Sequence, residues 1–215
     1  MKNHGFLLGA IAALALLGGG GGLIGFKLYQ KKVVEADVET CLRHLRVVYG
    51  DDPEGGLQCA FWDDEGALAA LEGLGPDAIP PLCRMIESTA DPDTLQSALV
   101  ALGTLGPSAG ERAPILIPIV RTRPFYQRCE ALWALGKLGN SSPEVLDCLS
   151  EAVLDPNTGA SQWPTAFESL IRLGPDSPQL ARTLVAIDAL TGETKHAEVL
   201  HGLRRRFRPQ PGRSP

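Results

Sequence analysis

The side chains that most often carry out chemistry are few and scattered in this chain. Its four histidines are His4, His44, His196 and His201, and none of them is followed by a glutamate. His196 and His201 are five residues apart, which on a helix turns their side chains about 140° away from each other. We therefore interpret both as solvated surface residues and not as joint ligands of a metal.

The five cysteines do not have the spacing of a metal site or of a disulfide framework. No Cys-x-x-Cys motif occurs, so a zinc site is not expected. Cys83, Cys129 and Cys148 fall within apolar helical patterns, which indicates small buried side chains. Cys41 and Cys59 flank a predicted loop and could pair in an oxidising compartment, which the sequence leaves open.

The acidic groups are also explained without catalysis. Asp51-Asp52 and Asp63-Asp64-Glu65 are typical of a turn and of a helix N-terminus, where carboxylates complement the helix dipole. No Gly-x-x-x-x-Gly-Lys phosphate loop is found. We predict no catalytic residue, no cofactor and no metal, and we expect a protein that is not an enzyme.

Charge is distributed unevenly along the 215 residues. Residues 1–32 contain four lysines and no acid, and residues 201–215 contain five arginines and no acid. The body between them carries 11 basic residues and all 25 acidic ones, a net charge of −14. Such an acidic body repels a phosphate backbone, so nucleic-acid binding is not expected.

The first predicted element of the chain is a membrane-spanning helix over residues 6–26. These residues carry no charge, and as a helix they match the roughly 30 Å of a bilayer's hydrocarbon layer. A cleaved signal peptide is the alternative, but the apolar run continues past its Ala-x-Ala sites. Gly18 and Gly22 form a GxxxG pair that could mediate self-association. Because lysines lie on both sides of the span, they hardly determine its orientation in the membrane. The orientation stays open, with a slight preference for residues 33–200 on the cytoplasmic side.

The sequence after this anchor, which we place at residues 1–32, divides into three further parts. Residues 33–60 are expected to form a helical stalk and linker, because the turn formers at 49–56 interrupt a helix. Residues 61–207 carry a repeated helical pattern. Residues 208–215 contain three prolines and a glycine and are expected to be a disordered tail.

The repeated pattern occurs four times and has a period near 33 residues. Each copy ends in a glycine, and these glycines are Gly75, Gly106, Gly139 and Gly174. Counted back from that glycine, Ala at −8, an apolar residue at −7, Ala or Ser at −5, and Leu at −4 and −1 form one helical stripe. The stripe includes Leu102 and Leu135. The glycine is expected to adopt the left-handed conformation that ends a helix.

A second helix is expected after each glycine, over residues 79–86, 113–120, 145–154 and 180–187. Prolines near the starts of these helices are compatible with their first turns. Pro118 lies deeper and is expected to kink its helix. Residues 194–207 should form a last, more polar helix that caps the stack.

The signature Ala-Leu-x-Ala-Leu-Gly-x-Leu-Gly-Pro resembles the short HEAT-like repeats of bilin lyases and of many bacterial scaffold proteins, over about residues 62–189. The resemblance implies an all-α fold: a short right-handed α-solenoid of four to five helical hairpins, here preceded by one transmembrane helix. HEAT-like metal hydroxylases hold iron through His-Glu pairs on their repeats, and such pairs do not occur in this chain.

Since the sequence has no motif for chemistry and an apolar run at 6–26, we expect a membrane-tethered scaffold that binds an unidentified protein partner through its surface. The alternative is a bilin-lyase-like or other small-molecule-handling enzyme on the same scaffold. Solenoids of this kind bind along a concave face built mostly from the second helices. The candidate partner contacts there are Arg84, Glu87, Arg121, Glu144, Asp147 and Glu151. The candidate contacts with anionic lipid are Arg204, Arg205, Arg206 and Arg208.

Overall fold

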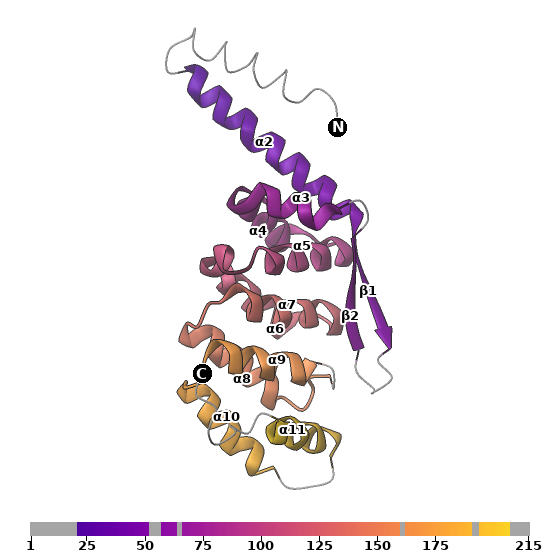
Figure 1. Ribbon diagram of the computed structural model, residues 1–215, viewed down its shortest axis with the longest axis vertical. Helices are drawn as coiled ribbons and strands as arrows, with labels where there is room; N and C mark the ends of the chain where they lie inside the picture. Colours follow the sequence, from indigo (N-terminus) through magenta and orange to yellow (C-terminus); the bar gives the residue numbers. More distant parts are fainter. Residues whose placement is uncertain (1–20, 52–56, 64–65, 160–161, 191–193, 207–215) are drawn as a thin grey trace.

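The computed structural model describes residues 21–51, 57–63, 66–159, 162–190 and 194–206. Along the chain, its helices and strands are α2 (Gly21–His44), β1 (Leu45–Asp51), β2 (Leu57–Asp63), α3 (Ala67–Leu74), the 3-10 helix η2 (Gly75–Ala78), α4 (Ile79–Ser88), α5 (Pro92–Thr104), the 3-10 helix η3 (Gly106–Leu116), α6 (Ile117–Thr122), α7 (Phe125–Leu138), α8 (Pro143–Leu154), α9 (Gln162–Leu173), α10 (Pro178–Asp188) and α11 (Lys195–Arg206). They stack along the longest axis, with α2 at one end and α10 and α11 at the other (Figure 1).

The helices from α3 to α10 form the two layers of an α-solenoid, as the repeat pattern predicts. The first helices of successive repeats, α3, α5, α7 and α9, pack against one another. The second helices α4, α6 and α8 pack behind them, and α10 continues their layer against α8. The last helix, α11, contacts both α9 and α10 at the C-terminal end. This arrangement confirms a helical-repeat fold.

The stripe of apolar residues in the first helices becomes the core. Leu102 and Leu135 are fully buried, and so are Leu99, Leu132 and Phe167. Burying a leucine side chain contributes about 1.5–3 kcal/mol relative to leaving it exposed. The leucines of the repeat signature therefore supply much of the stability of the stack.

Local signals in the sequence explain where the helices begin. At the start of α5, the Asp91 carboxylate accepts a hydrogen bond from the Thr94 amide at 2.9 Å. At the start of α10, the Ser177 hydroxyl accepts one from the Leu180 amide at 3.1 Å. Each bond satisfies an amide that has no partner within its own helix. Both helices then have a proline among their first residues, where its missing N–H has no consequence.

The four repeat glycines do not all have the expected conformation. Gly75, Gly106 and Gly139 have positive φ angles of 55°, 61° and 71°. Gly139, with a ψ of 11°, has the left-handed conformation expected at the end of a helix, whereas Gly75 has a ψ of −137° and lies outside that region. Gly174 differs because the space around it, and not its backbone, requires glycine. An added Cβ there would lie 3.0 Å from Cδ1 of Leu146 and 2.7 Å from the Ser177 hydroxyl.

The expected helical stalk and linker contains a β-hairpin. The helix α2 ends at His44, and β1 and β2 pair antiparallel with Val47 opposite Phe61. The two strands have the sequences LRVVYGD and LQCAFWD, which are rich in residues that favour strands. At the base of the hairpin, the Ser97 hydroxyl of α5 donates to the Leu45 carbonyl at 2.8 Å. This contact holds the chain where it leaves the helix.

The expected kink at Pro118 is also absent, because the helix around it starts later than predicted. The chain is a 3-10 helix from Gly106 to Leu116, and α6 begins only at Ile117. Pro118 therefore lies in the first turn of α6, where a proline is tolerated. As a result α6 has only six residues, fewer than any other second helix.

Several expectations concern residues that the structure describes only in part. Among the described residues, no helix has both the length and the apolar sequence needed to cross a membrane. The expected span at 6–26 shares only its last residues, 21–26, with α2. Gly18, the side chain of Cys59 and the tail at 208–215 lie outside the description, and so does the pairing of Cys59 with Cys41.

Candidate functional site: the second-helix face

The six predicted partner contacts lie on one surface of the solenoid. We call this surface, formed by the outward sides of α4, α6, α8 and α10, the second-helix face. Arg84 and Glu87 come from α4, Arg121 from α6, and Glu144, Asp147 and Glu151 from α8. Asp147 is half-buried and the other five side chains are exposed. The structure thus brings the six residues to the same face, spread along its length.

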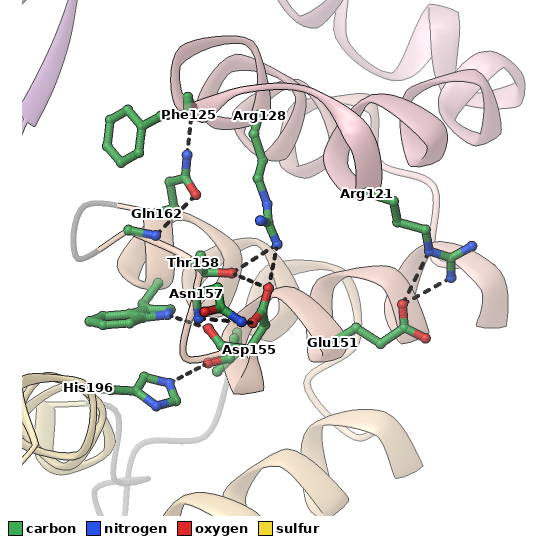
Figure 2. A network of polar contacts seen from close by, with 12 residues as sticks. Arg121, Phe125, Arg128, Glu151, Asp155, Asn157, Thr158, Gln162 and His196 are labelled. Atoms are coloured by element: carbon green, nitrogen blue, oxygen red, sulfur yellow. Dashed lines mark hydrogen bonds and ion pairs between the residues drawn. The ribbon is translucent and has the colours of Figure 1, made fainter.

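Arg121, Asp147 and Glu151 form ion pairs with a neighbouring repeat, and Arg84 forms one with α2. Glu151 accepts from Nε and Nη2 of Arg121 at 3.3 and 3.0 Å (Figure 2). Asp147 pairs with Arg182 of α10 at 3.1 Å, and Arg84 pairs with Glu35 of α2. The hydrogen bond to Glu151 raises the pKa of the Arg121 guanidinium. These exposed pairs set the contact between repeats but contribute little to stability.

The series of ion pairs is interrupted between α4 and α6. Within the described residues, neither Glu87 nor Arg123 forms an ion pair. Between them lies a groove of about 290 Å³. Its lining residues are Ile86, Glu87, Ile115, Pro118, Ile119, Thr122 and Arg123. The groove therefore has an aliphatic floor and charges of opposite sign on its two sides.

The groove follows from the irregular repeat that contains η3. Pro107 and Pro114 remove amide donors from this stretch of chain. At Gly110 an added Cβ would lie 2.8 Å from the Leu138 carbonyl, so η3 packs close to α7. Because residues 106–116 form the 3-10 helix η3, α6 begins late and is short, which leaves a gap beside α4. Arg123, which follows α6, was not among the predicted contacts. The only signal for it in the sequence is a charged residue directly before Pro124, at the end of a second helix.

A second group of polar residues is centred on Asp155, in the turn after α8 (Figure 2). Nη2 of Arg128 donates to the Asp155 carboxylate at 3.2 Å and to the Thr158 hydroxyl at 2.9 Å. The Asn157 amide donates to the same carboxylate at 2.9 Å. Burial raises the pKa of Asp155, but the hydrogen bonds from Asn157 and Arg128 outweigh it, so this pKa is lowered.

The same turn is tied to the helices around it. Gln162 donates from Nε2 to the Phe125 carbonyl at 2.6 Å, and the Trp163 indole N–H donates to the Asp155 carbonyl at 3.1 Å. The ring of His196 in α11 lies 4.4 Å from the Trp163 ring, and its Nε2 is 3.1 Å from the Val153 carbonyl oxygen. These contacts join α7, the α8–α9 turn and α11, so we interpret the group as structural.

The interpretation of His196 as a solvated residue was therefore wrong. Its side chain is buried because α11 packs against α9, and such a contact between distant segments is invisible in the local sequence. His201 is half-buried, with Nε2 3.3 Å from the Leu190 carbonyl oxygen. In the described part of the chain, no three His, Cys, Asp or Glu side chains are grouped so that they could hold a metal ion.

One sequence match to a catalytic motif lies in η3. Residues 106–110 read Gly-Pro-Ser-Ala-Gly, the spacing of a nucleophile elbow, which positions its serine on a sharp turn from a strand to a helix. Here the pentapeptide follows the helix α5 and belongs to a 3-10 helix. The Ser108 hydroxyl donates to the Leu105 carbonyl at 2.7 Å. This context is that of a local turn and not of an elbow.

Comparison with known proteins agrees with the repeat geometry. A family model described as PBS lyase HEAT-like repeat matches residues 127–155. The match covers nearly all of α7, all of α8 and the turn between them, which make up one repeat of the solenoid. No curated protein matches the chain.

Proposed function

Because the helices form an α-solenoid and residues 127–155 match a PBS lyase HEAT-like repeat model, we propose that the chain is a HEAT-like repeat protein. We propose that it acts as a non-enzymatic scaffold and binds another protein through its second-helix face. The observation that carries this proposal is the groove between α4 and α6, where the ion pairs between repeats are interrupted. Elsewhere on this face Arg84, Arg121, Asp147 and Glu151 have partners in the protein itself, whereas Glu144 forms no ion pair with the described residues and lies outside the groove. Glu87 and Arg123 are left to interact with a partner.

The chemistry of the groove defines the partner segment that would fit it. Ile86, Ile115 and Ile119 offer an apolar floor for one aliphatic side chain. Glu87 on one side favours a basic residue in the partner, and Arg123 on the other side favours an acidic one. We expect a short helical or extended segment in which an aliphatic residue is flanked by these two charges.

Charge reversal in the groove tests this proposal. Partners would be captured from detergent-solubilised membranes with the wild type, Glu87→Arg, Arg123→Glu and the double variant, and identified by mass spectrometry. We expect each single variant to reduce capture of the specific partner by about tenfold or more. The double variant keeps the net charge, so its loss of capture would exclude a general charge effect.

Matched controls are available on α9. Glu168 and Arg172 are exposed and lie outside the groove, so Glu168→Arg and Arg172→Glu should leave capture unchanged. If the groove variants and the controls capture the same proteins in equal amounts, the proposed binding site is wrong. A coloured adduct formed with an added bilin would instead support the alternative of a bilin-lyase-like enzyme.

We further propose that residues 6–26 tether the scaffold to a membrane as a single transmembrane span. The support is the uncharged run itself and the lysines that follow it, Lys27, Lys31 and Lys32. The full-length chain should then stay with membranes after high salt and alkaline carbonate, whereas a chain beginning at residue 33 should be released. Detection of a mature chain without residues 1–25 would identify a signal peptide instead.

A further inference from the structure

A cleft at the C-terminal end of the solenoid gathers positive charge. It lies between the end of α10 and the last turns of α11 and has a volume of about 420 Å³. Its lining residues are Asp188, His201, Arg204 and Arg205. Two guanidinium groups and one imidazole therefore face a single carboxylate. On α11, His201, Arg204 and Arg205 are spaced i, i+3 and i+4, so they share one side of the helix.

The guanidinium of Arg204 is held in place but only partly satisfied. Its side chain is 24% exposed. Nη2 lies 3.4 Å from the Asp188 carboxylate, which is longer than the roughly 2.7–2.9 Å of a good charge-assisted hydrogen bond. Nε is buried and has no hydrogen-bond partner among the residues described. Because the one acceptor of this guanidinium among the described residues is a carboxylate at a long distance, a further acceptor beside its Nη groups would be stabilising.

The two neighbouring side chains are oriented around the same space. Nε of Arg205 donates to the His201 carbonyl at 3.3 Å, which directs this arginine along α11 while its side chain stays exposed. His201 is anchored through Nε2 to the Leu190 carbonyl at 3.3 Å. Each of the three side chains on α11 that line the cleft therefore has a hydrogen bond that orients it.

We infer that this cleft binds the phosphate group of a phosphomonoester. A guanidinium presents parallel N–H donors that match two oxygens of a phosphate, and Arg204 and Arg205 provide two such groups beside each other. Asp188 pairs with Arg204 at 3.4 Å, so phosphate binding would exchange this long ion pair for several charge-assisted hydrogen bonds. The inference is independent of the proposed partner groove, which lies on α4 and α6.

The ligand can be a soluble phosphomonoester or a lipid headgroup with the same chemistry, and the fold favours the soluble one. The helices α10 and α11, whose residues line the cleft, lie at the opposite end of the long axis from α2 (Figure 1). If residues 6–26 enter a bilayer, α2 is the end next to it, and α11 is the end farthest along the stack. This placement bears on the predicted lipid contacts as well: Arg204 and Arg205 line the cleft, whereas the side chains of Arg206 and Arg208 are outside the description.

The experiment uses the full-length chain in a neutral detergent at matched ionic strength. Phenyl phosphate and inorganic phosphate would be titrated and followed by calorimetry and by ³¹P line broadening, with chloride as the control anion. We expect Arg204→Gln and Arg205→Gln each to weaken binding by about tenfold or more. Arg182→Gln removes an arginine of α10 that pairs with Asp147 and should leave binding unchanged. Circular dichroism would verify that each variant is folded.

The variant Asp188→Asn separates a ligand site from a structural ion pair. Removing the competing carboxylate should tighten phosphate binding severalfold, whereas a purely structural pair would give only a change in thermal stability. Two kinds of vesicle, one of neutral lipid alone and one that also contains phosphatidic acid, distinguish a lipid headgroup from a soluble phosphomonoester. Binding to the vesicles with phosphatidic acid, without binding of phenyl phosphate, would assign the cleft to a headgroup. If neither probe binds, or if all variants bind as the wild type does, the arginines only complement the carbonyl end of α11 and the inference is wrong.

Discussion

The close approach of α7 and α9 depends on the absence of a side chain at Gly136. A Cβ at this position would lie 2.2 Å from the Ser169 hydroxyl oxygen and 2.9 Å from the Ser169 Cβ. Rotation of Ser169 could move the hydroxyl away, but its Cβ is fixed to the backbone of α9. We therefore predict that Gly136→Ala forces the two helices apart and destabilises the protein.

The magnitude follows from two opposing terms. Replacing glycine by alanine within a helix gains roughly 0.5–1 kcal/mol. Overpacking a well-filled contact costs about 1–3 kcal/mol, and the Ser169 side chain is almost fully buried. The expected net loss is about 0–2.5 kcal/mol, centred on about 1 kcal/mol, in the free energy of unfolding, measured by urea denaturation and circular dichroism on a chain beginning at residue 33.

A second substitution identifies the cause. Ser169→Gly removes both clashing atoms and leaves only the Ser169 Cα, at 3.5 Å from the new Cβ, which is an ordinary contact. Gly136→Ala should therefore be much less destabilising in a Ser169→Gly background than in the wild type, so the two changes should not be additive.

The matched control is Gly73→Ala in α3. An added Cβ there has no neighbouring atom within 4 Å. Only the higher helix propensity of alanine remains, so the protein should become slightly more stable. If Gly136→Ala behaves like Gly73→Ala, or if Ser169→Gly gives no rescue, the helices do not pack as closely as the structure indicates.

Three further predictions test the core, the turn after α8 and a buried thiol. Leu102→Ala or Leu135→Ala should each lower the free energy of unfolding by about 2–5 kcal/mol, because both side chains are fully buried; a loss below about 1 kcal/mol in urea denaturation at both positions would contradict the repeat assignment. The folded state lowers the pKa of Asp155, so its contribution to stability should be complete above the ordinary value of 3.8 and be lost as the pH falls through the lower, folded value. Melting temperatures measured from pH 6 to pH 3 should accordingly fall less steeply for Asp155→Asn than for the wild type, and parallel curves would refute this. Burial raises the pKa of Cys148 to about 11, so at pH 8 iodoacetamide should modify this thiol only after unfolding; rapid labelling of the native protein, detected by peptide mass spectrometry, would show that it is not buried.

The helical repeats could be predicted from the sequence because the information that defines them is local. A stripe such as Leu132, Leu135 and Leu138, followed by Gly139, specifies a helix, its buried side and its end within one short segment. Leu102 and Leu135 were accordingly placed correctly in the core. Short apolar runs are ambiguous by comparison, which is why the strand at 45–51 was expected to be part of a stalk and linker. The strand at 57–63 was divided between that linker and the repeat domain, which was expected to begin at residue 61.

The candidate site depended on contacts between residues that are far apart in the chain. Arg121 and Glu151 are 30 residues apart, and only the stacking of successive repeats brings them together. His196 is buried for the same reason, because α11 folds back onto α9. The sequence by itself thus determined the first helices of the repeats and the sides that they bury, but not the hairpin at 45–63 or the 3-10 helix at 106–116. The tertiary structure decided which charges are paired and which are left to line a groove, because the packing of one repeat on the next sets the distances between their side chains.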